Sequence, residues 1–385
     1  MNFNKKAFLV YNQRTDLKLS MRGSVLNVVN VTFIFSGRWM GAGWLTNLSD
    51  FVDDPNRIAH DSDAADVLDR HNVAMPTSFD QLQGACDAVQ GHYGLSAFVA
   101  DRLHHWDWIP YLMGMGGRIF RDPPENLTLV LVTPEAIRSA QRYAELLAKF
   151  GPSGMLSFLD GQAMRSQMAS RAFFCTQALT WLVPLAKQDE STVKSNVRYS
   201  LMPSGPQGNI PGSDSHGLGI PAGSRCKEAA WEFIKWALSK EMLNRIVTEH
   251  GYPSVCRRSV ITGEAFKRAM TLNGQDVAAL YLQVLELGGR SGYMKYRTVP
   301  VFPQVGDPIT RAIGRIATRQ QDAAAAMRQA QQDAVQVLQR AGVTVDGGRG
   351  PRECRAAPCC GAVAWNVRVI ASLCSASRRR SPCWR

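Results

Sequence analysis

Two tryptophans flank an aspartate in the stretch HHWDW, which covers residues 104–108. An indole ring can stack on the apolar C–H face of a small molecule, and a carboxylate accepts hydrogen bonds from hydroxyl groups. Trp106, Asp107 and Trp108 are therefore candidates for binding a ligand that carries both kinds of group. Two alternatives stay open: either tryptophan can pack in the core, and Asp107 can cap a helix.

Motifs for covalent or nucleotide chemistry are missing from the sequence. It contains no GxSxG nucleophile elbow, no GxxxxGK[ST] phosphate loop and no HExxH metal motif. His104 and His105 have no further ligand at metal-binding spacing, so we expect them at the surface or at a helix end. A carboxylate pair for glycoside hydrolysis is not excluded, but no two carboxylates are singled out. We therefore expect no catalytic residue, no cofactor and no metal, in a protein that is not an enzyme.

The length and composition favour a protein of two lobes. The chain has 385 residues, of which 45% are hydrophobic, and a single core stops growing at roughly 250–300 residues. No apolar run approaches the roughly 20 residues that a membrane helix needs. The first residues, MNFNKKAFLVYNQRTD, hold only a short and interrupted apolar run, so they do not form a recognisable signal peptide.

Positive charge is concentrated at the carboxyl end. The formal net charge is +12, and residues 346–385 supply half of it, with eight Arg against one Asp and one Glu. The rest of the chain has no basic stripe interleaved with aromatics and no helix-turn-helix or zinc-finger pattern, which argues against a nucleic-acid partner. Five of the nine cysteines also lie in this tail, at spacings that suit no zinc site. We expect the tail to be disordered or the product of a shifted reading frame.

Strand and helix signals alternate through the middle of the chain, as in an α/β protein. Thr77 or Ser78 can cap a helix, and Thr133 followed by Pro134 marks the start of another. The loop 204–215 is rich in Gly and Pro, and such loops often carry binding function. Strands are expected at 24–35, 94–100, 198–203 and 216–221, and helices at 109–115, 136–150, 227–239 and between 307 and 341.

Several phrases of the sequence resemble the extracellular solute-binding proteins of type 1 that serve sugar importers. The sharpest is SDSHGLGIPAGSRCKEAAWEFIKWALSKEMLNRIVTEHGYPSVCRRSV, residues 213–260, which follows the family's order of a Gly-rich ligand loop, a strand end, a helix and a Gly-x-Pro-x-R-x-S-like turn. Other similar phrases are VVNVTFIFSGRWMGAGWLTNLSDFV, PTSFDQL, WDWIPYLMGMGGRIF and TPEAIRSAQRYAELL. Together they cover most of residues 24–343.

The resemblance implies an α/β protein with a two-lobed, periplasmic-binding-protein-like (type II) fold and a hinge. It also implies an incomplete first lobe, because the family's first strand-helix-strand unit has no counterpart before residue 24 and about ten residues replace a longer stretch after Pro55. The expected division is an unassigned N-terminus at 1–23, a partial first lobe at 24–90, mainly second lobe with hinge crossings at 91–225, a helical part of both lobes at 226–345 and the tail at 346–385.

Further binding residues follow from the resemblance. His216 stands where the family places a cleft-facing aromatic residue, although it can also be a simple turn residue. Trp39 can line the opposite wall of the cleft. Tyr252 and Arg257 can reach solute hydroxyls, although Arg257 can equally form an ion pair that stabilises the lobe. The remaining tryptophans on apolar helical stripes are expected to pack: Trp181, Trp231 and Trp236.

As the resemblance implies, the protein is expected to be the substrate-binding component of an ABC importer. It would bind a sugar, polyol or related hydroxylated solute as a monomer and deliver it to the membrane permease subunits. The implied location is the periplasm. Two alternatives remain: a non-functional, truncated remnant of such a protein, and a carbohydrate-active hydrolase.

Overall fold

The computed structural model of the protein describes residues 15–21, 28–31, 38–39, 42, 44–46, 75–90, 95–101, 104–158, 161–176, 182–187, 191–193, 197–212, 216–299 and 301–343. These residues belong to one unit, and the other unit, residues 47–60 and 348–385, lies outside the described residues. The expected N-terminal segment 1–23 is described only at 15–21, and the tail 346–385 lies entirely outside. The division into lobes and hinge crossings therefore stays a prediction.

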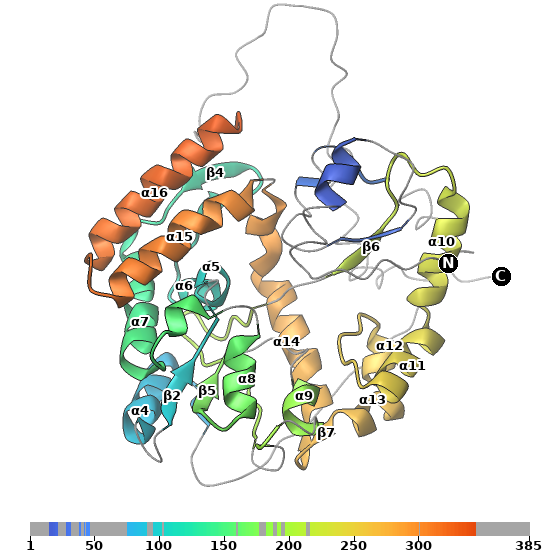
Figure 1. Ribbon diagram of the computed structural model, residues 1–385, viewed down its shortest axis with the longest axis horizontal. Coiled ribbons are helices and arrows are strands. Elements are labelled where there is room, and N and C mark those ends of the chain that lie inside the picture. Colours follow the sequence, from blue (N-terminus) through green and yellow to red (C-terminus); the bar gives the residue numbers. More distant parts are fainter. Residues whose placement is uncertain are drawn as a thin grey trace, which may run out of the picture. The chain divides into compact units, whose positions relative to one another are not determined.

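Short strands pair two by two in the described ranges (Figure 1). β2 (Ser96–Val99) runs parallel to β5 (Ala172–Cys175). The other pairs are antiparallel: β1 (Val29–Val31) with β6 (Gly217–Gly219), β3 (Phe120–Asp122) with β4 (Asn126–Leu129), and β7 (Thr271–Leu272) with β8 (Gln275–Asp276). The parallel pair positions the candidate site, because the carboxyl ends of both its strands reach the same edge.

Helices connect these strands and give a mixed α/β protein. The longest are α7 (Pro134–Phe150), α14 (Val277–Ser291), α15 (Phe302–Ala317) and α16 (Ala323–Arg340). The others are α4 (Phe79–Val89), α5 (His104–Asp107), α6 (Ile109–Gly114), α8 (Gln162–Met168), α9 (Leu182–Lys187), α10 (Lys227–Ala237), α11 (Lys240–His250), α12 (Arg258–Ile261), α13 (Glu264–Ala269) and the 3-10 helices η2 (Met155–Ser157) and η4 (Tyr293–Thr298). None of the helices described is long and apolar enough to cross a membrane.

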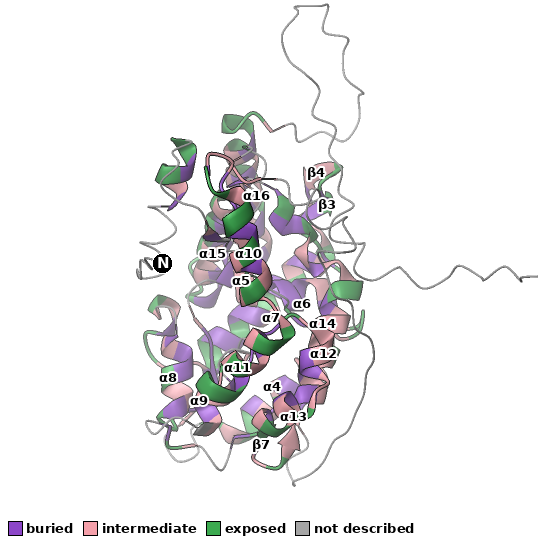
Figure 2. Ribbon diagram, turned by 90° about the vertical axis from the view of Figure 1, so that its right-hand side faces the viewer, coloured by how far each residue is buried: buried purple, intermediate pink, exposed green. Residues whose placement is uncertain are grey.

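The larger hydrophobic cluster surrounds the parallel pair β2–β5. α7, α15 and α16 pack against one another in it (Figure 1). Ala140, Ala144 and Leu147 recur at helical spacing on α7 and are all buried, so this helix contributes one apolar stripe to the cluster. Figure 2 shows the same division along the helices, with buried residues on one side and exposed residues on the other.

A second hydrophobic cluster forms where α8 and α9 meet the helices α11–α14. Its buried members include Met164 of α8, Leu185 of α9, Val247 of α11 and Phe266 of α13. The Phe266 ring packs edge-on against Tyr281 of α14, with 5.5 Å between the ring centroids. The two clusters account for most of the buried apolar side chains described.

Helix starts and several elements match their sequence-based predictions. The Ser78 hydroxyl accepts a hydrogen bond from the Gln81 N–H at 3.2 Å, and Thr133 caps α7 in the same way by accepting from the Ala136 N–H at 3.3 Å. Both caps are thereby confirmed. The expected strands at 94–100 and 216–221 appear as β2 and β6, and the expected helices appear as α6, α7, α10, α15 and α16.

Two sequence-based predictions are wrong, and a third holds only in part. Residues 198–203 form no strand, because a side chain satisfies the backbone of Tyr199: its N–H donates to Gln275 Oε1 at 2.9 Å and its carbonyl accepts from Gln275 Nε2 at 3.1 Å. Of the two expectations for the histidine pair, a surface position fails because both side chains are buried, whereas a position at a helix end holds because α5 begins at His104. Trp236 is 54% exposed, whereas Trp231 packs as expected and Trp181 lies outside the described residues.

Candidate functional site

The carboxyl end of β2 leads directly into the segment with the candidate tryptophans. Asp101 follows β2, and its carboxylate accepts hydrogen bonds from the Gly161 N–H at 3.2 Å and the Ala163 N–H at 3.0 Å, at the start of α8. α5 then begins at His104. In open α/β sheets, ligands bind outside the carboxyl ends of the parallel strands, so this edge is the place where a site is expected.

Trp106 of α5 is half-buried and is held by residues from η4. The guanidinium carbon of Arg297 lies 5.7 Å from the centroid of the Trp106 ring, and the Tyr293 hydroxyl donates to the Trp106 carbonyl oxygen at 3.5 Å. Arg297 is itself buried, and its Nε donates to the Tyr296 hydroxyl at 3.0 Å. Two distant parts of the chain therefore meet around this indole ring.

The Gly/Pro-rich loop approaches the same place. A side-chain carbon at Gly212 would lie only 3.3 Å from the Tyr293 hydroxyl oxygen and 3.5 Å from Pro110 Cγ, so the backbone of the loop passes close to η4 and α6. Residue 216 follows four positions later along the chain. We call this region the α5 site and define it by Trp106, Asp107, Gly212, Tyr293 and Arg297.

His105 attaches helix α5 to helix α15. The Thr310 hydroxyl accepts from the His105 backbone N–H at 3.2 Å and lies 2.7 Å from Nδ1, to which it can donate. A side-chain carbon at Gly306 would lie 2.5 Å from His105 Cδ2, so glycine is needed for this close approach. Burial, the Arg297 charge and His104 lower the pKa of His105 to about 3, and burial lowers the pKa of His104 to about 4. Both rings are neutral near pH 7.

The structure separates the two tryptophans of the HHWDW stretch. Trp108 is fully buried in the larger cluster, and its indole N–H donates to the Ser139 hydroxyl of α7 at 3.1 Å. Asp107 is half-buried, and its charge contributes to raising the pKa of Tyr111 and Tyr143, after the larger effect of burial. Trp108 therefore packs in the core next to the site, whereas Trp106 and Asp107 remain partly accessible to solvent.

The other sequence-predicted residues lie on different elements. Trp39 is fully buried, and its indole N–H donates to Asp16 Oδ1 at 3.0 Å. His216 is exposed at the start of β6. The Arg257 Nε donates to the Leu238 carbonyl oxygen at 2.6 Å, which ties the start of α12 to the end of α10. Whether these side chains contact a solute stays a prediction.

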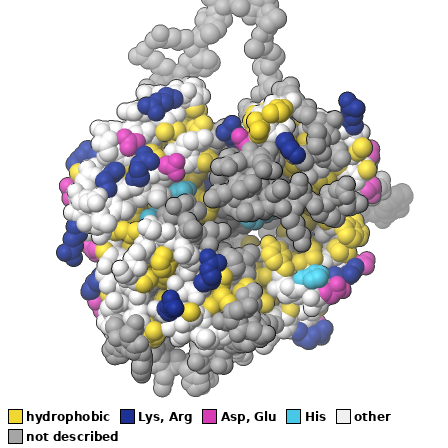
Figure 3. Space-filling view, in the orientation of Figure 1, with side chains coloured by type: hydrophobic (Ala, Val, Ile, Leu, Met, Phe, Trp, Pro, Cys, Tyr) yellow, Lys and Arg dark blue, Asp and Glu magenta, His cyan; other side chains and the backbone are white. Residues whose placement is uncertain are grey.

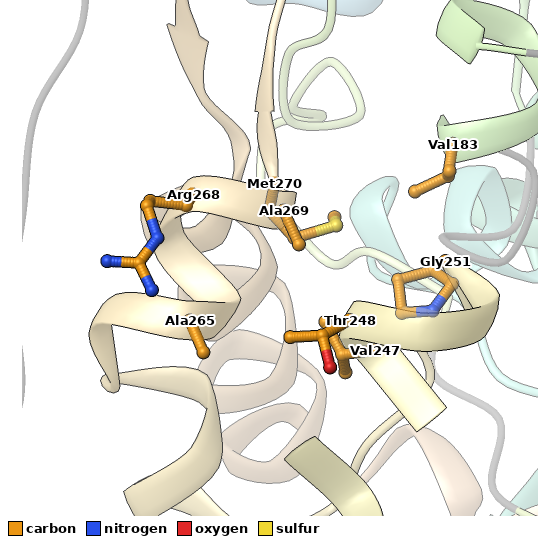
Figure 4. A pocket seen from close by; sticks show the side chains of 9 residues that line it. Val183, Val247, Thr248, Gly251, Ala265, Arg268, Ala269 and Met270 are labelled. Carbon is orange, nitrogen blue, oxygen red and sulfur yellow. The ribbon is translucent and has the colours of Figure 1, made fainter. Parts of the chain in front are cut away.

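Tyr252 lies at the edge of a hollow between α9, α11 and α13. Its neighbours Gly251 and Pro253 line this hollow, which has a volume of about 380 Å³, and Val183 of α9 lies across from Thr248 of α11 (Figure 4). The lining is mainly apolar, and the Arg268 guanidinium points away from the other lining side chains (Figure 4). With no aromatic residue in its lining, this hollow offers no stacking platform.

A second hollow of about 460 Å³ lies between α4 and α7 and is lined by charged and amide side chains, among them Asp80, Gln83 and Arg142. It also has no aromatic lining. No three His, Cys, Asp or Glu side chains in the described ranges gather to hold a metal ion. The α5 site is therefore the described region that best combines an aromatic face, a carboxylate and a guanidinium.

Sequence reasoning missed Tyr293 and Arg297. They belong to the stretch GYMKYRTVP, in which aromatic and basic residues alternate next to a proline. That mixture is a usable signal, because aromatic and arginine side chains together often line binding surfaces.

The mixed α/β arrangement, with the parallel pair β2–β5 among helices, is a type II periplasmic-binding-protein-like fold, which similar solved structures share. Residues 61–273 match the family described as bacterial extracellular solute-binding protein. Because this match covers more than half of the chain, the protein belongs to that family.

Known proteins with similar sequences or folds bind sugars and polyols. The chain is 27% identical over 144 residues to the erythritol/L-threitol-binding protein of Mycolicibacterium smegmatis, which is 37% of this chain and 30% of the relative. The chain thus spans about a third of the length of the curated relative it matches.

Three solved structures share the fold. A solute-binding protein from Agrobacterium radiobacter K84 in complex with ribitol has a TM-score of 0.69 at 19% identity, covering 86% of this chain and 90% of the other. One from Agrobacterium vitis S4 with bound D-mannitol has a TM-score of 0.68 at 18% identity, covering 86% and 89%. Maltose-bound MalE3 from Thermotoga maritima has a TM-score of 0.64 at 19% identity, covering 85% and 89%.

Proposed function

We propose that the protein captures a polyol or sugar at the α5 site and delivers it to the permease subunits of an ABC importer. The observation that carries this proposal is the half-buried Trp106 ring, which Arg297 holds and which the half-buried Asp107 follows in the sequence. The ring offers an apolar surface for C–H groups, and the carboxylate accepts hydrogen bonds from hydroxyl groups. Such a pair suits a neutral, hydroxyl-rich molecule.

The ligands of similar proteins support a polyol in particular. The curated relative is named for erythritol and L-threitol, and two of the solved structures hold ribitol and D-mannitol. All four are linear polyols. A linear polyol has a flexible carbon chain with a hydroxyl on each carbon, so it can lie along one indole face while its hydroxyls reach polar groups at the edge.

The proposed role involves binding without chemical conversion. Family membership supports a location outside the cytoplasm, where a monomer would meet its solute. Solute would favour the closed arrangement of the two lobes, because some contacts form only in that arrangement. The permease subunits would then recognise the closed protein.

Thermal unfolding against a panel of solutes tests this proposal. A ligand that binds only the folded protein raises the midpoint of unfolding. The panel contains tetritols, pentitols, hexitols and disaccharides, with amino acids and dipeptides of similar size as controls. We expect at least one polyol or sugar to raise the midpoint. A rise caused only by the amino acids or dipeptides, or by no solute at all, would overturn the proposal.

A further inference from the structure

Buried polar side chains with few hydrogen-bond partners gather next to the first residue of α5. They are both ring nitrogens of His104, the hydroxyls of Tyr111 and Tyr143, and Thr176 Oγ1, and all these atoms are buried. Among the residues described, the Tyr111 and Thr176 side chains hydrogen-bond to each other, whereas the His104 ring nitrogens and the Tyr143 hydroxyl have no partner. We call these four residues the buried polar cluster.

The four side chains come from four elements that converge at the carboxyl edge of β2–β5. His104 lies on α5, Tyr111 on α6 and Tyr143 on α7, while Thr176 follows the end of β5. The centroids of the His104 and Tyr143 rings are 6.0 Å apart, and those of the Tyr111 and Tyr143 rings are 5.1 Å apart. The hydrogen bond between the Thr176 and Tyr111 side chains lowers the pKa of Tyr111, against the larger rise caused by burial.

The electrostatic surroundings connect the cluster to the α5 site. Burial raises the pKa of both Tyr111 and Tyr143, and the negative charge of Asp107 raises them further. Asp107 is half-buried and neighbours Trp106, whereas the cluster is buried. His104 of the cluster and Trp106 of the α5 site lie on the same short helix, α5.

A group of unpartnered polar atoms in one buried place is unusual. Most buried polar side-chain atoms have a hydrogen-bond partner in the protein or in ordered water, because leaving one without a partner destabilises the fold. A hydroxyl oxygen can donate once and accept twice. Neutral His104 offers one donor and one acceptor, and each tyrosine hydroxyl can do either, so the cluster matches that pattern of donors and acceptors.

We infer that the buried polar cluster binds a hydroxyl oxygen, supplied either by ordered water or by one hydroxyl of the solute. An anion is disfavoured, because the Asp107 carboxylate would repel it. Binding of a solute hydroxyl rests on the proposed function, whereas binding of water does not.

The variant Tyr143→Phe tests the inference, since it removes one cluster hydroxyl and keeps the ring. The matched control is Tyr199→Phe: Tyr199 is also buried, but its hydroxyl donates to the Leu182 carbonyl oxygen at 2.7 Å. Thermal unfolding of the full chain without solute is measured for both. If water occupies the cluster, both variants lower the midpoint, each by about 2 °C.

Calorimetric titration with a polyol that raises the wild-type midpoint tests whether a solute hydroxyl, instead of water, occupies the cluster. If a solute hydroxyl occupies the cluster, Tyr143→Phe weakens binding at least fivefold, while its midpoint without solute stays equal or rises. An equal or higher midpoint together with unchanged affinity would overturn the inference. Failure of every solute to bind would overturn the proposed function. The unfolding midpoints of the two variants would still show whether water occupies the cluster. Thr176→Val is the second variant, should Tyr143→Phe not fold.

Discussion

The Arg297 guanidinium lies over the Trp106 indole, with its central carbon 5.7 Å from the ring centroid. Arg297 also lies over the Tyr296 ring at 5.2 Å and donates from Nε to the Tyr296 hydroxyl, so its position is fixed from two sides. The indole ring is thereby held before a solute arrives. A side chain that is already ordered loses less conformational entropy on binding, which strengthens affinity.

Replacing Arg297 should weaken solute binding through Trp106. Arg297→Met removes the cation above the indole ring, and we expect a loss of affinity of about 3- to 30-fold, the range for a cation–π contact. Arg297→Lys keeps the charge without the planar group, so its affinity for the solute should lie between that of Arg297→Met and that of the wild type. Calorimetric titration of folded variants measures the effect. Equal affinity of Arg297→Met and wild type would contradict the positioning role.

Acid should destabilise the protein through its buried histidines. The pKa of His104 is lowered from 6.5 to about 4 and that of His105 from 6.5 to about 3. Below pH 6.5 the unfolded chain binds protons that the folded chain does not, so the free energy of unfolding has its full value above pH 7 and falls as the pH drops towards 4. We expect a loss of about 1–2 kcal/mol per ring by pH 5.

The variant His104→Gln isolates this effect, because it removes one of the two titrating rings. Denaturant unfolding at pH 5 and pH 8 should show a smaller stability difference for His104→Gln than for wild type. His250 is exposed, so His250→Gln serves as control and should keep the wild-type difference. The same pH dependence in all three proteins would show that His104 is protonated in the folded state.

Asp101 should stabilise the edge of the sheet on which α5 begins. Its carboxylate accepts hydrogen bonds from two backbone N–H groups at the start of α8, so Asp101→Ala leaves both donors unsatisfied. We expect a loss of about 1–2 kcal/mol in the free energy of unfolding, as for other helix caps. Asp87→Ala is the control, because it removes only an exposed ion pair with Lys149 and should change stability by less than about 1 kcal/mol. Equal losses would refute the capping role.

Local signals in the sequence predicted most of the elements around the site. Ser78 and Thr133 cap their helices as expected, since a helix cap depends on a few neighbouring residues. The strand in 94–100 was also predictable, because a short apolar run is enough to indicate it. The expected strand at 198–203 failed because its backbone bonds to the side chain of the distant Gln275, which no local pattern reveals.

The candidate site was predictable only in part. Trp106 and Trp108 are two positions apart, so in helical conformation their side chains point in nearly opposite directions, and only one can face a ligand. Which one does so depends on α7, whose Ser139 binds the Trp108 indole. His104 and His105 were expected at the surface or at a helix end, because no further metal ligand lies near them in the sequence. Their burial depends on packing against α7 and α15, far away in the sequence.

The affinity of the Trp106→Ala variant for a polyol tests the central claim most directly. Wild type, Trp106→Ala and Trp236→Ala are titrated calorimetrically with a polyol that raises the wild-type midpoint. Trp236 is exposed on α10, so its variant controls for the loss of an indole ring. It is one of many hydrophobic side chains at the surface, and Figure 3 shows others scattered among charged ones. We predict that Trp106→Ala binds at least about 30-fold more weakly, whereas Trp236→Ala binds like wild type. Wild-type affinity in Trp106→Ala would mean that the solute binds elsewhere in the protein.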